Sequence, residues 1–146
     1  MPRLAYYYRH TDDETPKEKA FRQGFALIEE HKLFRYLGGE VHIKPNKEYG
    51  RNGIAAIEKN RRIYVNTNLS RTPQEWAYTI AHCLLHLAFG HYDDDRIPKD
   101  DNGHYDPILW NIACDIYITR FLYDITFGEP ACDDPAEVYS IKLNEE

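Results

Sequence analysis

The sequence predicts a single α+β domain in which helices pack on a small β-sheet around one buried central helix. A strong helix pattern comes first, short alternating strands follow, and two further helix patterns complete the order. The 146 residues suit one domain spanning 1–146, and no linker divides them. With 42% hydrophobic and 29% charged residues, the composition is that of a folded globular protein.

The first predicted helix covers residues 15–37, "TPKEKAFRQGFALIEEHKLFRYL". Thr15 is a suitable N-cap, Pro16 suits the first helical position, and Glu18 completes a capping-box pattern. Apolar residues recur at helical spacing along the segment, and Gly38-Gly39 is expected to end the helix.

Three short strands are predicted next. Residues 40–45, "EVHIKP", alternate between apolar and polar side chains and stop at Pro45. Residues 53–57 and 62–66 form two further β segments, joined by a polar turn at 58–61.

Two helices follow the strands. The first begins with Thr72 as cap and Pro73 at the first position, has Glu75 in its first turn, and ends at Gly90. It is apolar around most of its circumference, so we expect it at the centre of the domain. A polar loop, 92–107, separates it from a last helix at about 107–125.

Charge and cysteine content limit the function classes. Residues 93–146 carry 4 Lys+Arg against 14 Asp+Glu, which argues against a nucleic-acid-binding protein. No apolar run is long enough to cross a membrane, and "MPRLAYYYRH" lacks the apolar core of a secretory leader. Three cysteines cannot form a fully paired disulfide framework, so we expect a reduced, cytoplasmic protein.

The stretch "AHCLLHLAFGH", 81–91, holds three of the seven histidines. His82 and His86 are four residues apart, so on a helix their imidazoles point the same way and can reach one ion. His91 follows Gly90, where the chain can leave the helix and bring back a third imidazole. Three protein ligands with an open fourth position are typical of catalytic zinc sites. The alternative is a set of hydrogen-bonded core histidines.

The last helix supplies a further candidate ligand. Asn111 and Asp115 lie four residues apart on one face of an otherwise apolar segment. A carboxylate there is costly to bury unless it is paired, hydrogen-bonded or bound to metal. Asp115 is therefore expected either to ligate the ion or to accept a hydrogen bond from a histidine ligand and orient it. An ordinary hydrogen bond between helices is the alternative.

Together, "WAYTIAHCLLHLAFGHYD" and "LWNIACDIYIT" resemble a bacterial metallopeptidase domain family, zincin-like in fold, that often precedes a von Willebrand factor A-like domain. The resemblance implies a Zn²⁺ site, a peptide or protein substrate, and a von Willebrand factor A-like partner domain. By the same resemblance, strand 62–66 would be the sheet edge that holds an extended peptide, but an ordinary sheet strand is the favoured alternative. The matching positions are His82, His86, His91, Trp110, Asn111, Ala113 and Asp115.

Cys83 is the departure from the zincin pattern, because it stands where such enzymes carry a glutamate that takes a proton from water. Asp115, Asp93 and Asp94 are candidate replacements for that base, whereas Glu75 lies two helical turns from His82. A cysteine-protease interpretation, with Cys83 as nucleophile and His86 as base, is disfavoured because Cys83 lies in the middle of a helix. A packing role for Cys83 is favoured instead.

Two functions follow from the sequence. One is a zinc-binding, metallopeptidase-like domain that hydrolyses peptide bonds. The other is a catalytically inactive zincin-like module that binds a protein partner, with the metal or the histidine cluster serving only to stabilise the fold.

Overall fold

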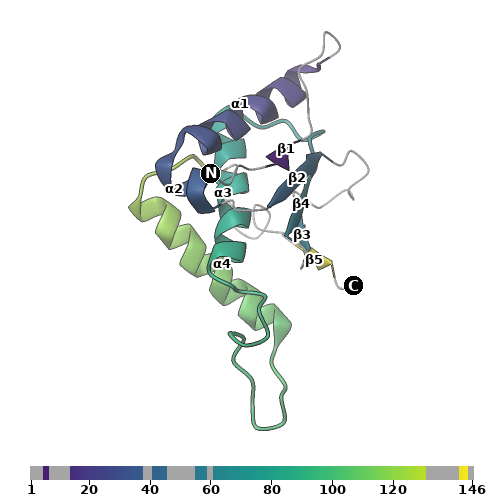
Figure 1. The fold of residues 1–146 in the computed structure, drawn as a ribbon, viewed down its shortest axis with the longest axis vertical. Helices are drawn as coiled ribbons and strands as arrows, with labels where there is room; N and C mark the ends of the chain where they lie inside the picture. Colours follow the sequence, from purple (N-terminus) through teal and green to yellow (C-terminus); the bar gives the residue numbers. More distant parts are fainter. Residues whose placement is uncertain are drawn as a thin grey trace.

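The computed structural model describes residues 5–6, 14–37, 41–45, 55–58, 61–130 and 142–144, and confirms a mixed α+β architecture (Figure 1). The described elements, in chain order, are β1 (Ala5–Tyr6), α1 (Pro16–Glu30), α2 (Lys32–Leu37), β2 (His42–Pro45), β3 (Ala55–Glu58), β4 (Arg62–Val65), α3 (Pro73–Ala88), α4 (Pro107–Asp124) and β5 (Lys142–Asn144).

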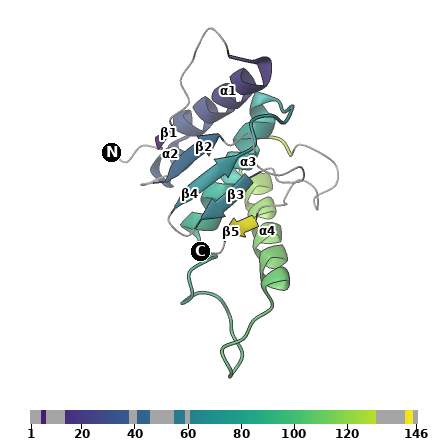
Figure 2. The same ribbon diagram turned by 90° about the vertical axis from the view of Figure 1, so that its right-hand side faces the viewer.

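The strands form one sheet in the order β1-β2-β4-β3-β5, with the helices on one side of it (Figure 2). β1, β2 and β4 run parallel, whereas β3 runs antiparallel to β4 and parallel to β5. The register places Ile43 beside Ile63, and Ile63 beside Ile57, so their buried side chains line one face.

Strand 62–66 is an ordinary strand of the sheet, the favoured interpretation, and not the edge that the resemblance implies. β4 lies inside the sheet, hydrogen-bonded to β2 on one side and to β3 on the other. Its backbone groups are therefore already paired and cannot receive an added peptide strand. Strand order depends on the crossover connection between β2 and β4, which no local pattern reveals.

Helix α3 is the centre of the domain, as its apolar circumference predicts. It packs against α1, α2, α4 and strand β3, and every side chain from Trp76 to His86 is buried. The ring of Trp76 meets Phe21 of α1 edge to face, with 5.2 Å between ring centroids. A helix surrounded in this way has fixed side-chain positions, which is what a precise ligand site requires.

The predicted helix 15–37 is two helices in the structure. Thr15 caps α1 as expected, but the backbone turns extended at His31 (φ −80°, ψ 125°) and α2 starts at the next residue. The Nδ1 atom of His31 accepts the backbone N–H of Leu33, at 3.2 Å, and so caps the new helix. Neither glycine nor proline marks this break, and the apolar periodicity continues across it. The sequence therefore predicted one helix.

Both ends of α3 agree with the prediction. Thr72 and Glu75 form a reciprocal capping box, in which the Glu75 carboxylate accepts the Thr72 backbone N–H at 2.9 Å. At the other end Gly90 has φ +65°, and the backbone N–H of His91 donates to the His86 carbonyl at 3.1 Å. This 6→1 hydrogen bond is typical of a Schellman motif. The motif requires a residue in the left-handed backbone conformation, which glycine adopts without strain.

Two short strands in the structure were not predicted from the sequence, and some of the predicted features lie in residues that the structure does not describe. β1 and β5 were not predicted, because strands of two and three residues show no alternation. Gly38-Gly39, residues 53–54 and Cys132 lie outside the described residues. Among the described helices, none combines the length and hydropathy needed to cross a membrane.

The approach of α1 to α3 depends on Gly24. A Cβ atom at this position would lie 2.6 Å from the Cβ of Trp76 and 2.7 Å from the Pro73 carbonyl oxygen. Gly24→Ala is therefore expected to lower the free energy of unfolding by about 1–2 kcal/mol, although alanine favours a helix interior by about 1 kcal/mol. Urea denaturation measures this. The exposed neighbour Gln23→Ala is the control and should change stability by less than about 0.5 kcal/mol. A stabilised Gly24→Ala protein would contradict the close packing of α1 on α3.

Candidate metal site

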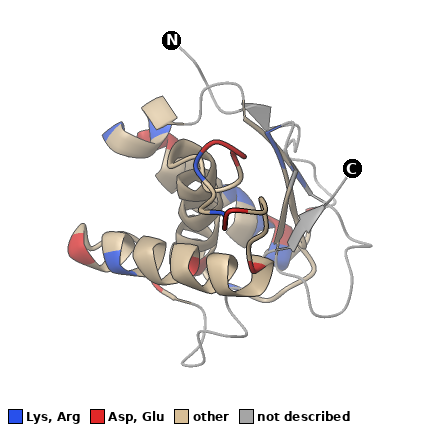
Figure 3. Cartoon of the chain, turned by 90° about the horizontal axis from the view of Figure 1, so that it is seen from below, with Lys and Arg blue, Asp and Glu red and all other residues tan. Residues whose placement is uncertain are grey.

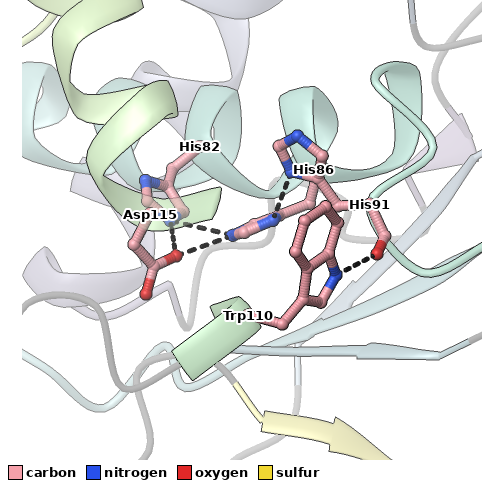
Figure 4. Close-up of polar contacts among 5 residues, drawn as sticks. All are labelled: His82, His86, His91, Trp110 and Asp115. Carbon is pink, nitrogen blue, oxygen red and sulfur yellow. Dashed lines mark hydrogen bonds and ion pairs between the residues drawn. The ribbon is translucent and has the colours of Figure 1, made fainter. Parts of the chain in front are cut away.

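Two histidines of α3 and one carboxylate of α4 meet at the contact between these helices (Figure 4). The Nε2 atoms of His82 and His86 each lie 2.9 Å from Oδ1 of Asp115, and 3.1 Å from each other. The four-residue spacing on α3 aligns the two imidazoles, and the midpoint of α4 places Asp115 across from them. The structure thus brings together three of the predicted ligands in a group that could hold a metal ion.

The charge state of this group suits a cation. Burial lowers the pKa of His82 and lowers that of His86 to about 4. The hydrogen bonds that Asp115 accepts from the two histidines oppose this shift without overcoming it. Burial raises the pKa of Asp115, but the hydrogen bonds from the two histidines outweigh that effect and the pKa is lowered. At neutral pH the group therefore holds two neutral imidazoles and one carboxylate, a net negative charge at a site of low exposure.

The distances within the group also suit an ion. A tetrahedral zinc shell with ligand distances of about 2.0–2.2 Å has neighbouring ligand atoms about 3.3–3.6 Å apart. The observed separations of 2.9–3.1 Å need to widen by only a few tenths of an ångström. With its proton on Nε2, either histidine can donate to Oδ1 of Asp115. Binding an ion requires the tautomer that carries its proton on Nδ1 instead.

His91 occupies a different place from the one predicted. Its Nδ1 atom lies 3.2 Å from Nδ1 of His86, the ring nitrogen that faces away from Asp115, and His91 is not in the group of candidate ligands. The Schellman motif at the end of α3 fixes this position, because it ties the His91 backbone to the His86 carbonyl. In the metal-binding tautomer, His86 can donate its Nδ1–H to His91, an arrangement that orients a ligand.

Trp110 holds the start of α4 beside the turn that follows α3. Its indole Nε1–H donates to the His91 carbonyl oxygen at 2.7 Å, joining the start of α4 to the turn that follows α3 (Figure 4). In the sequence, Trp110 is one of the matching positions of the resemblance, and no structural role for it was predicted. A lone tryptophan in an apolar helix carries no local signal for a hydrogen bond to a backbone 19 residues earlier.

Cys83 is a packing residue in the structure. Its side chain is fully buried within the hydrophobic core, one helical step of about 100° from His82, and it is not in the ligand group. Burial raises the pKa of the thiol far above its usual range. A thiol that stays protonated can act neither as nucleophile nor as base, so the sequence preference for a packing role agrees with the structure.

A pocket of about 490 Å³ opens beside His86. Tyr92, which lines it, stacks on the His86 ring with 5.3 Å between centroids. Three acidic residues, Asp93, Asp94 and Asp95, and one basic residue, Arg61, also line the pocket. Arg61 has φ +66°, a backbone conformation uncommon for a residue with a side chain. Two of the predicted replacement bases, Asp93 and Asp94, thus lie at this opening.

Comparison with models of protein families, with curated proteins and with solved structures found no match to this chain. The assignment of function therefore depends on the site itself.

Substitution distinguishes a direct ligand from a residue that orients one. We expect His86→Ala and Asp115→Ala to abolish stoichiometric zinc binding in calorimetric titrations, because each removes one of three ligand atoms. His91→Ala should keep one ion per chain, with the dissociation constant raised about 10–100-fold through loss of the orienting contact.

The exposed loop residue His104 provides the matched control, since His104→Ala removes an imidazole remote from the group and should leave binding unchanged. If His91→Ala abolished binding as completely as His86→Ala does, His91 would be a ligand and the described arrangement would be incorrect.

Proposed function

We propose that this chain is a zincin-like, zinc-dependent hydrolase domain that acts on peptide bonds. His82, His86 and Asp115 hold the ion. The observation that carries the proposal is the convergence of two neutral imidazoles and one ionised carboxylate within hydrogen-bond distance of one another. Nitrogen and oxygen ligands of this kind suit zinc, and three of them leave a coordination position open.

The ion, when bound, supplies Lewis-acid chemistry that polarises a carbonyl and makes a water molecule more acidic. The chain's own residues position the ligands and the substrate. Asp115 holds both imidazoles in register, and Tyr92 and His91 fix the plane of the His86 ring from two sides. A ligand held on several sides has little freedom to turn away from the ion.

The pocket beside His86 is the proposed substrate site. Arg61 offers a positive charge to the carbonyl oxygen as it becomes negative, and Asp93 or Asp94 accepts the proton that the missing glutamate would take elsewhere. The strained backbone of Arg61 supports this assignment, because such conformations cluster at functional sites.

One observation favours a second function. Cys83 replaces the usual proton acceptor and is a buried, protonated thiol. Loss of a positioned general base slows hydrolysis by about 10²–10⁴-fold. In the second function the ion is structural: it ties α3 to α4, and the domain binds a protein partner without cleaving it.

A pair of substitutions at position 83 separates the two functions. Cys83→Glu restores the carboxylate next to His82 and should raise cleavage of a quenched fluorescent peptide library by about 10²–10⁴-fold. Cys83→Gln is the matched control, because it has the same shape without a base and should give no gain.

Metal content and circular dichroism establish that each variant is folded and loaded with zinc. If neither the loaded wild-type protein nor the loaded Cys83→Glu protein cleaves any peptide of the library, the hydrolase proposal is wrong and the structural role of the ion is favoured.

A further inference from the structure

Helix α4 has two unlike faces. The inner face carries Asp115 and packs Cys114, Ile118 and Leu122 against the rest of the domain. The outer face, as we call it, is apolar and open to solvent, with every member at least half exposed. Its members are Ile108, Leu109, Ile112, Ile116 and Tyr123.

These five residues form a continuous stripe. At 100° per residue they fall within an arc of roughly 100° and extend along most of the helix. Figure 3 shows α4 running across the lower part of the view with few charged residues along it. A surface helix normally places polar residues on the side away from the core, so this face departs from the usual pattern.

The area of the outer face is large for a free surface. With roughly 200 Å² for each fully exposed side chain of this size, the exposed fractions of the five residues give roughly 650 Å². Apolar patches on monomeric proteins seldom exceed about 600 Å², whereas a stable interface buries about 800 Å² per partner. The area of the outer face together with a polar rim around it would match the area that a stable dimer buries on each partner.

The charges beside the outer face are self-complementary. Asp106 and Arg120 are both exposed and lie 14 positions apart, so they fall on the same flank of α4 near opposite ends. In a two-fold antiparallel pair of helices, like flanks face each other. A two-fold axis midway between Ile112 and Ile116 would place each Ile112 against Ile116 of the second copy. The same axis would place each Arg120 opposite position 108 of the second copy, two residues or about 3 Å along the helix from Asp106, which the long arginine side chain can reach.

We propose that the outer face of α4 binds a second copy of this chain and forms a two-fold symmetric, antiparallel dimer. The apolar stripe supplies the buried area, and the two Arg120–Asp106 pairs select the antiparallel orientation. Asp115 lies roughly 75° around α4 from the centre of the outer face, on the side that packs against α3, so the proposal requires neither metal binding nor hydrolysis.

Sedimentation velocity on the 146-residue chain, from 5 to 100 µM, tests the proposal. The expected mass is twice the chain mass of 17.2 kDa. Ile112→Lys should raise the dissociation constant more than tenfold, because it places a charge at the centre of the interface. Tyr36→Lys is the matched control: it alters an exposed apolar residue on α2, away from α4, and should leave the dimer intact.

Circular dichroism confirms that each variant is folded. A wild-type chain that stays monomeric at 100 µM would overturn the proposal and indicate a different partner for the outer face. A dimer that Ile112→Lys does not weaken would equally overturn it, since the interface would then lie elsewhere.

Disulfide trapping tests the orientation. In the antiparallel arrangement, the double variant Ile112→Cys, Ile116→Cys should form intermolecular disulfides on oxidation, because each new thiol faces the other position in the second copy. Each single variant should crosslink much less. Efficient crosslinking of both single variants would indicate a parallel pair and contradict the proposed axis.

Discussion

The contact of one carboxylate with two imidazoles joins the last long helix to the centre of this protein. Asp115 lies on the inner face of α4, and its Oδ1 atom receives both His82 and His86 from α3. The Asp115 side chain is 21% exposed, and a partly buried charge is costly unless it is paired. Here the pairing groups come from a different helix. The position of α4 is therefore coupled to the geometry of the site: displacing the helix would leave an ionised carboxylate without its partners.

The rest of the fold holds α3 so that its histidines cannot move. The capping box at Thr72 and Glu75 fixes where the helix begins, and the Schellman motif at Gly90 fixes where it ends. The second of these also sets the position of His91 beside His86, and the Trp110 hydrogen bond ties the same turn to α4. Helix α3 thus carries two candidate ligands, and the turn at its C-terminal end holds His91 against one of them.

Local patterns predicted most of the helices and three members of the site. The four-residue spacing of His82 and His86 is visible within one helical turn, and the Asp115 carboxylate stands out in the middle of an otherwise apolar helix. Local patterns could not predict which nitrogen of the His86 ring His91 would contact. That contact depends on the path of the backbone through the Schellman motif after α3. Strand order and the break at His31 likewise follow from packing between distant segments.

The central claim is that His82, His86 and Asp115 share one ion, and anomalous diffraction from zinc-loaded crystals tests it most directly. We expect one strong anomalous peak per chain, about 2.0–2.2 Å from Nε2 of His82, Nε2 of His86 and a carboxylate oxygen of Asp115. A peak between the Nδ1 atoms of His86 and His91, or no peak within reach of Asp115, would show that the three residues form a hydrogen-bonded core cluster rather than a metal site.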